Sequence, residues 1–225
     1  ASYTLEGWML RAEVVHAARQ DRVPSDDVAT ASYTLLNFAV SKKLAVAGND
    51  TTRTAISHGM NLLARHPEQR SIWQHDVDGV TASAVEEIVR YASPVTFMRR
   101  TLTTDLTMSG HDFVEGDKVV MLYGAANRDP RAFDDPEVFD VRRTPNPHLG
   151  FGGPGPHFCL GANLARRELA VVFRDLFARL PDIEVTGDVV PLDVAGLPLV
   201  GGIKRLPVRF TPTPRSGARS TTSTA

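Results

Sequence analysis

The stretch from His148 to Gly161 reads HLGFGGPGPHFCLG and contains the chain's single cysteine, Cys159. A loop rich in glycine and proline thus brings a thiol to the start of a helical pattern that runs from about Leu160 to Leu180. The glycines allow a flat ligand to approach the backbone closely, and the unpaired amides at a helix N-terminus stabilise a thiolate. A thiolate held in this way can ligate haem iron.

Other roles for this loop stay open on its residues alone. A glycine-rich loop before a helix can cradle a phosphate, although no Gly-Lys-Ser/Thr follows the loop. The neighbouring His157 could pair with Cys159 in nucleophilic catalysis, and a lone cysteine is most often a buried small hydrophobe. Nothing else in the chain supports the phosphate site or the nucleophile.

The composition is that of an ordinary globular protein. The 225 residues include 42% apolar and 23% charged side chains, and the formal net charge is -1. No basic field indicates a nucleic-acid partner, and the apolar stretches are too short for a membrane span. A single cysteine excludes an internal disulfide, and no signal peptide is visible, so we expect a cytoplasmic protein.

The N-terminal part of the chain has a helical pattern. We expect a short amphipathic helix from Leu10 to Arg19 and a long helix from about Thr30 to Arg65, which stops before Pro67. A further helix is expected to start near Ser83, where a capping box begins, and to end before Pro94.

The second half of the chain changes character. Strand patterns run from Thr101 to Met108 and from Lys118 to Tyr123. Residues 127–147 are rich in Asp, Arg and Pro and indicate an ordered, irregular connection. A pair of strands is expected around Gly201, and residues 214–225 are expected to form a disordered tail.

A polar break interrupts the long helical pattern at Ala47-Gly48-Asn49-Asp50-Thr51-Thr52. Gly, Asn, Asp and Thr are poor helix-interior residues. The break therefore predicts either a local opening within one helix or the boundary between two helices. The residues alone leave both interpretations open.

These motifs together resemble the cytochrome P-450 family. The cysteine loop is similar to the family's haem-binding loop, and the polar break is similar to its oxygen-activation segment. The spacing of Glu87 and Arg90 and the segment Asn127–Pro136 match further motifs, in the family's order. The resemblance covers about Ser25 to Pro212. It implies the C-terminal, haem-binding half of a fold that is mainly α with small β-sheets, as a partial domain over residues 1–213.

The resemblance implies a haem b (iron protoporphyrin IX) site with Cys159 as the ligand of the iron. Further residues that would contact the haem are His157, Arg100, Phe151, Gly48 and Ala47. His157 and Arg100 would bind propionates. Phe151 would pack near the sulfur, although it lies one residue further from Cys159 than in the generic family pattern.

The resemblance also implies catalytic and supporting residues. Thr51 would hydrogen-bond the activated oxygen or its water, and Asp50 would relay protons from solvent. Glu87 and Arg90 would join Arg143 in a buried clamp behind the haem. Their spacing by itself is equally typical of a weak surface pair.

An apolar pocket would lie on the far side of the haem, lined by Val95, Thr96 and Leu199, although ordinary core packing would explain these residues equally well. The implied activity is monooxygenation of a sterol, fatty acid or terpenoid type of substrate. Electrons would come from NAD(P)H through a ferredoxin reductase and a ferredoxin. Family members are longer than this chain, so an inactive fragment that binds haem or a partner only is an alternative, as is non-oxygenating chemistry on the same fold.

Overall fold

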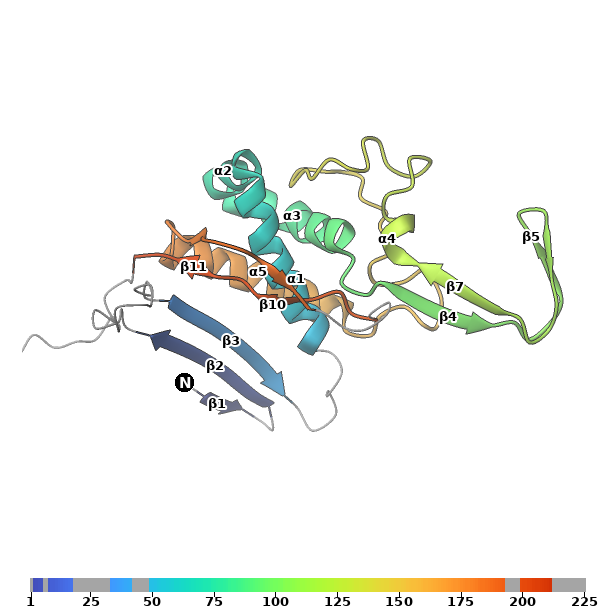
Figure 1. Cartoon of the computed structure of the whole chain (residues 1–225), viewed down its shortest axis with the longest axis horizontal. Coiled ribbons are helices and arrows are strands. Elements are labelled where there is room, and N and C mark those ends of the chain that lie inside the picture. The colour runs from blue at the N-terminus through green and yellow to red at the C-terminus, as the bar shows by residue number, and fades with distance from the viewer. Residues whose placement is uncertain (1, 6–7, 18–32, 42–48, 193–198, 212–225) are drawn as a thin grey trace, which may run out of the picture.

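The computed structural model describes residues 2–5, 8–17, 33–41, 49–192 and 199–211 (Figure 1). The helices are α1 (Asn49–Arg65), α2 (Pro67–His75), α3 (Val77–Ala92), α4 (Tyr123–Ala126) and α5 (Ala162–Arg179). The strands are β1 (Ser2–Leu5), β2 (Trp8–Ala17), β3 (Tyr33–Ser41), β4 (Phe97–Thr101), β5 (Leu106–Met108), β6 (His111–Phe113), β7 (Lys118–Leu122), β8 (Glu184–Val185), β9 (Val190–Pro191), β10 (Ile203–Arg205) and β11 (Val208–Arg209). The helices contribute more residues than the strands, and the strands pair in small sheets.

The three longest helices, α1, α3 and α5, pack against one another around the apolar core (Figure 1). Gly59 of α1 lies where these helices meet, since a Cβ there would be 2.6 Å from the ring of Phe173 and 2.8 Å from Ile88. Trp73 of α2 is fully buried, and its ring centroid lies 4.9 Å from that of Phe173. The helix that carries Thr51 and the helix that follows Cys159 therefore share one core.

The start of α3 differs from its prediction. Asp76 caps the helix by accepting a hydrogen bond of 2.9 Å from the N–H of Gly79. The predicted start near Ser83 is therefore wrong, because this stronger cap lies further upstream. The hydroxyl of Ser83 instead donates to the carbonyl of Val141 at 2.6 Å.

The ends of α1 and α3 lie where the sequence predicts them. α1 ends at Arg65, and Pro67 opens α2 in the first turn, where its missing N–H costs nothing. α3 is followed by Ser93, which adopts a left-handed conformation with φ 42° and terminates the helix before Pro94.

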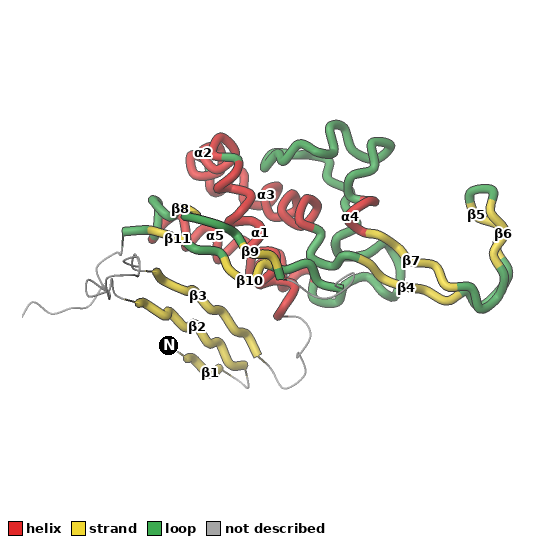
Figure 2. The backbone as a smooth tube through the Cα atoms, in the orientation of Figure 1, coloured by secondary structure: helices red, strands yellow, loops and turns green. Residues whose placement is uncertain are grey.

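β4 and β7 form an antiparallel ribbon that extends away from the helices and continues into the β5–β6 hairpin (Figure 2). The predicted strand from Lys118 is confirmed as β7. The predicted strand from Thr101 to Met108 is divided, because a bend at Thr103 and Thr104 separates the end of β4 from β5. The N–H of Leu102 bonds the carbonyl of Asp117 at 2.9 Å and closes the ribbon there.

The C-terminal part agrees with its predictions. α5 confirms the helix after the cysteine loop, and residues 127–147 contain no strand and a succession of turns. β9 pairs with β10, and the carbonyl of Gly202 accepts the N–H of Leu192 at 2.8 Å. The predicted tail, residues 214–225, lies outside the described residues.

The helices predicted before residue 42 are wrong. β2 occupies the range of the short helix predicted from Leu10 to Arg19, and β3 occupies the first part of the long helix predicted from Thr30, whereas α1 confirms its second part. β1, β2 and β3 form an antiparallel sheet, in which the register pairs Trp8 with Leu5 and Ala17 with Tyr33. Aromatic and β-branched residues recur in these segments, and pairing between strands satisfies their backbone groups as a helix would.

None of the helices in the described part of the chain has the length and apolarity that a membrane crossing requires.

Candidate functional site

The cysteine loop is closed by its own backbone. The N–H of Cys159 donates to the carbonyl of Phe151 at 2.9 Å, and the N–H of Ala162, the first residue of α5, donates to the carbonyl of Cys159 at 3.2 Å. Gly152 and Gly155 have φ of 89° and 131°, values that side-chain-bearing residues rarely adopt. The glycines thus allow the tight path that places the thiol just before the first turn of α5.

The thiol lies in an open and largely apolar setting. Cys159 is exposed, and its neighbours Phe158 and Leu160 are 47% and 103% exposed. Leu164, one turn further along α5, is 50% exposed. An apolar surface of this kind around a thiol fits a flat apolar ligand, which would cover these side chains and contact the sulfur.

Glu87 and Arg90 form a fully buried, two-pronged ion pair. Arg90 Nε donates to Glu87 Oε2 at 2.7 Å, and Arg90 Nη2 donates to Glu87 Oε1 at 2.8 Å. The remaining N–H groups of Arg90 bond the carbonyls of Asn127, Pro136 and Val138 at 2.8–3.0 Å. Every N–H of the guanidinium therefore has a partner, so the buried charge is fully hydrogen-bonded.

Arg143 is brought to the same carboxylate, with Nε 3.3 Å from Glu87. The N–H of Asp140 and the side-chain amide of Asn146 also donate to Glu87, both at 3.0 Å. Arg143 further bonds the carbonyls of Asp134, Asp135 and Val138. One buried carboxylate thus organises the irregular connection that precedes the cysteine loop.

Asn127 links this connection to the loop itself. Its side chain is fully buried, accepts the N–H of Leu149 at 2.7 Å and donates to the hydroxyl of Ser93 at 2.9 Å. Its carbonyl accepts from Arg90. The ion pair, the connection and the first residues of the loop are therefore one hydrogen-bonded unit.

A second charged group lies beside the loop. Arg166 of α5 donates to Glu86 with Nε and Nη2, at 2.6 and 2.9 Å, and His148 Nε2 lies 2.9 Å from the same carboxylate. Burial alone would raise the pKa of Glu86, but the hydrogen bonds from His148 and Arg166 outweigh it and lower the pKa from 4.5 to about 2. Glu86 is therefore an anion throughout the physiological range.

Asp50 and Thr51 lie in the first turn of α1, where an acidic side chain is favourable. The described part of this helix begins at Asn49, and residues 42–48, which would distinguish an opening from a helix boundary, lie outside the described residues. Asp50 is exposed and pairs with Arg53 at 3.2 Å. Ala47 and Gly48, for which the sequence predicts haem contacts, lie outside the described residues.

Thr52 joins α1 to α5 through a hydrogen bond with Glu168. Burial raises the pKa of Glu168 above its usual value, and the bond with Thr52 offsets only part of this shift. A half-buried carboxyl group thus lies next to the turn that carries Asp50 and Thr51.

The two residues predicted to bind propionates are both exposed. Arg100 lies on β4, and its guanidinium donates to the carbonyl of Arg99 at 3.1 Å. His157 lies in the cysteine loop, two residues before Cys159. Each can therefore reach an acidic group on a ligand, and neither is held by a buried partner.

The predicted pocket residues are brought together by backbone pairing. Val95 forms an isolated β-bridge with Val200, and the N–H of Thr96 donates to the carbonyl of Leu199 at 3.0 Å. His58 Nε2 lies 2.8 Å from the carbonyl of Gly201 and so connects α1 to the same pair of segments. Leu199 is half exposed.

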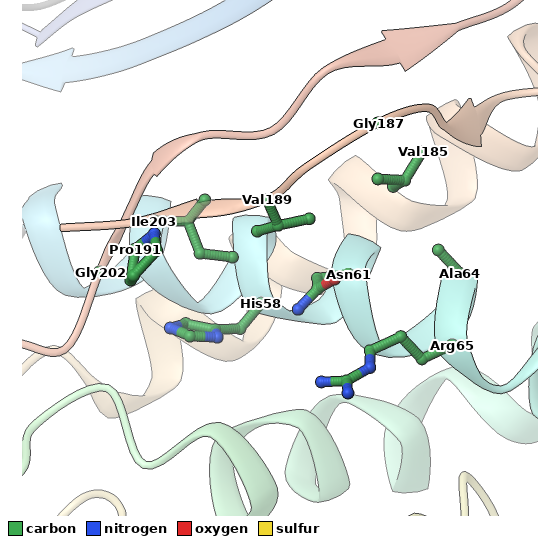
Figure 3. Close-up of a pocket in the computed structure, with 10 residues that line it drawn as sticks. All are labelled: His58, Asn61, Ala64, Arg65, Val185, Gly187, Val189, Pro191, Gly202 and Ile203. Carbon is green, nitrogen blue, oxygen red and sulfur yellow. The ribbon is translucent and has the colours of Figure 1, made fainter.

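A separate cavity of about 530 Å³ lies between α1 and the C-terminal strands (Figure 3). Figure 3 shows His58, Asn61 and Arg65 projecting from one side of α1, opposite Val189 and Ile203. It contains none of the residues predicted for the haem or substrate sites.

Sequence reasoning missed Glu86, Asn127, Asn146 and Arg166. Arg166 lies in the helix predicted after Cys159, but its position in that pattern does not pair it with Glu86. Asn127 and Asn146 flank the irregular connection, where amides commonly satisfy backbone groups.

In the described residues, no group of three or more His, Cys, Asp or Glu side chains could hold a metal ion.

The cytochrome P450 family model matches residues 38–181. The methyl-branched lipid omega-hydroxylase of Mycobacterium tuberculosis is 54% identical over 168 residues, which are 75% of this chain and 39% of the relative. The steroid C26-monooxygenase of Rhodococcus jostii is 50% identical over 145 residues, 64% of this chain and 30% of the relative. The chain thus spans about two-fifths or less of the length of these curated relatives.

The fold is also similar to that of solved structures. A Mycobacterium marinum cytochrome P450, CYP268A2, in complex with pseudoionone, superposes with a TM-score of 0.70 and is 47% identical. The match covers 74% of this chain and 39% of that one.

Proposed function

Since the chain belongs to the cytochrome P450 family, we propose that it provides the haem-binding part of a monooxygenase for apolar substrates. The reaction would insert one atom of dioxygen into a C–H bond and release the other as water, consuming two electrons and two protons. The observation that carries the proposal is the exposed Cys159, presented by a glycine loop at the start of α5 and surrounded by open apolar side chains.

Haem b, when bound, supplies the iron at which dioxygen is activated. The residues of this chain hold and orient that group. Cys159 would offer its sulfur to the iron from the end of the loop, just before the first residue of α5. Phe158 and Leu160 provide apolar contact area, and His157 and Arg100 are cationic or donor groups that can bind propionates.

The ion pair of Glu87 and Arg90 keeps the loop in place rather than taking part in the chemistry. Both side chains are fully buried, and their partners belong to the connection that leads into the loop. Arg143 completes this clamp from the connection itself. Thr51 and Asp50 are the groups that we assign to proton delivery, since a hydroxyl and a carboxylate lie together in the first turn of α1.

The substrate class follows from the pocket segments and from the relatives. Val95 and Leu199 are apolar and lie on segments that pair with each other. The relatives named above are an omega-hydroxylase of methyl-branched lipids and a C26-monooxygenase of steroids. We therefore assign a branched lipid or a sterol side chain as substrate, with electrons from NAD(P)H through a ferredoxin reductase and a ferredoxin.

Turnover with isotope-labelled dioxygen tests the activity. The haem-loaded chain is supplied with a surrogate ferredoxin pair, NADPH and a methyl-branched fatty acid or cholest-4-en-3-one, and the products are analysed by mass spectrometry. We expect a terminal hydroxyl that carries one labelled oxygen atom. Haem binding without any labelled product would contradict monooxygenation by this chain and would favour a fragment that only binds haem.

A further inference from the structure

The cysteine loop is supported on one side by a charged group that the proposed chemistry does not use. Arg166 and Glu86 form a two-pronged ion pair with N–O distances of 2.6 and 2.9 Å. Glu86 precedes the fully buried Glu87 on α3, so its backbone is fixed by the helix that anchors the whole connection. Arg166 lies in the second turn of α5, the helix that starts after Cys159.

Arg166 contacts the loop through an aromatic ring. Its guanidinium carbon lies 4.4 Å from the ring centroid of Phe151, a separation typical of a cation–π contact. The carbonyl of Phe151 accepts the N–H of Cys159 at 2.9 Å. When the ring of Phe151 is held in place, the carbonyl of Phe151, which accepts the N–H of Cys159, is held in place as well.

His148 ties the start of the loop to the same ion pair. A carboxylate can only accept, so His148 Nε2 donates to Glu86 at 2.9 Å, and Nδ1 accepts the N–H of Gly150 at 3.1 Å. The two bonds define a single tautomer. A Cβ on Gly150 would lie 2.5 Å from Val89, so this residue packs directly on α3.

We propose that Arg166 is a positioning residue for the cysteine loop. Held by Glu86, its guanidinium locks the ring of Phe151 and thereby sets the place of the Cys159 sulfur. This role applies already to the chain without haem and does not rest on the proposed function.

Hydrogen exchange of the haem-free chain tests the positioning role. In Arg166→Gln we expect exchange in the peptide spanning residues 149–160 to accelerate on the order of tenfold, the effect of losing one such contact. Peptides from the core of α3 should exchange as before. The matched control is Arg174→Gln, which removes an ion pair of the same helix with the exposed Asp78 and should leave the loop unchanged.

Unaltered loop exchange in Arg166→Gln, or equal acceleration in both variants, would overturn the proposal. If Arg166→Gln does not fold, Phe151→Leu removes only the ring and keeps the ion pair, and the same acceleration is expected. Arg166→Lys keeps the charge but not the two-pronged geometry, so it should restore little of the protection.

The haem-loaded protein gives a second readout of the same role. We expect Arg166→Gln to change the reduction potential of the iron, because the sulfur that would bind it is held differently, and Arg174→Gln should leave the potential unchanged. If the wild-type chain gives no thiolate-type spectrum, the proposed function fails, and loop exchange still decides on positioning. If the wild type gives that spectrum and the two variants have equal potentials, Arg166 does not set the place of the sulfur.

Discussion

At the scale of single residues, the carboxylate of Glu87 connects several segments of the described structure. It is fully buried and accepts hydrogen bonds from Arg90, Arg143, Asn146 and the backbone of Asp140. A buried carboxylate is tolerated only when its charge is compensated and its oxygens are bonded. Arg143, Asn146 and Asp140 belong to the connection that leads into the cysteine loop. The hydrogen bonds that compensate the charge of Glu87 therefore also order this long segment.

Glu87→Gln leaves the guanidinium of Arg90 buried without an anion. We expect a loss of about 3–5 kcal/mol in the free energy of unfolding, measured by urea denaturation. The control is Arg131→Gln, which removes an ion pair with Asp129 at the surface and should give no measurable change. Equal effects of the two substitutions would contradict the assigned role.

Glu86 should make stability depend on pH in an acidic window. Its pKa falls from 4.5 in the unfolded chain to about 2 in the folded one, mainly because His148 and Arg166 outweigh its burial. The stabilisation is therefore present above pH 4.5 and is lost as the pH falls toward 2. Since Glu86 is partly exposed, we expect about 1–2 kcal/mol. Glu86→Gln should be less stable than wild type at pH 6, and the difference should shrink at pH 3.

The sequence revealed some of these residues and not others. Cys159, Glu87 and Arg90 stand in recognisable patterns, so the order of amino acids is enough to select them. The partners of Glu86 lie 62 and 80 positions away in the chain, and no local pattern signals such pairs. The same holds for Asn127, whose contact with Leu149 depends on how the connection folds back.

At the scale of elements, the crossing of α1 with its neighbours depends on the absence of a side chain at Gly59. A Cβ would meet the ring of Phe173 at 2.6 Å and Ile88 at 2.8 Å. Overpacking of a core costs about 1–3 kcal/mol, whereas Ala gains only about 1 kcal/mol over Gly from helix propensity. The destabilisation by crowding at Gly59 should therefore exceed the gain in helix propensity.

Gly59→Ala should accordingly destabilise the protein by about 1 kcal/mol in thermal or urea unfolding. Gly124→Ala in α4 is the matched control, because no atom lies within 4 Å of the added Cβ. It should be neutral or slightly stabilising. A stabilising effect of Gly59→Ala would show that the three helices do not pack as described.

Local signals decided which elements could be predicted. α5 follows a loop full of glycine and proline, and α1 and α3 end before Pro67 and Pro94, so the start of α5 and the C-terminal ends of α1 and α3 followed from backbone chemistry. The N-terminal strands were missed because apolar residues at mixed spacing fit a helix and a strand alike. Their pairing with one another is a long-range property that periodicity does not contain.

At the scale of the whole molecule, the chain contains the thiol loop and its supporting clamp but spans only about two-fifths of the curated relatives. Leu160 is exposed just before α5, Leu164 and Val171 are exposed along it, and Val120 and Leu122 are exposed on β7. Exposed apolar side chains at helical spacing form a surface that a ligand or a partner could cover. Leu160 of this surface directly follows Cys159, the iron ligand that we propose.

The central claim is that the sulfur of Cys159 ligates haem iron in this chain. The most direct measurement is the absorption spectrum of the chain reconstituted with haem, reduced and exposed to carbon monoxide. We expect the red-shifted Soret band of thiolate-ligated iron in the wild type and its loss in Cys159→Ser. A wild-type spectrum without that band, or a band that persists after the substitution, would contradict the claim.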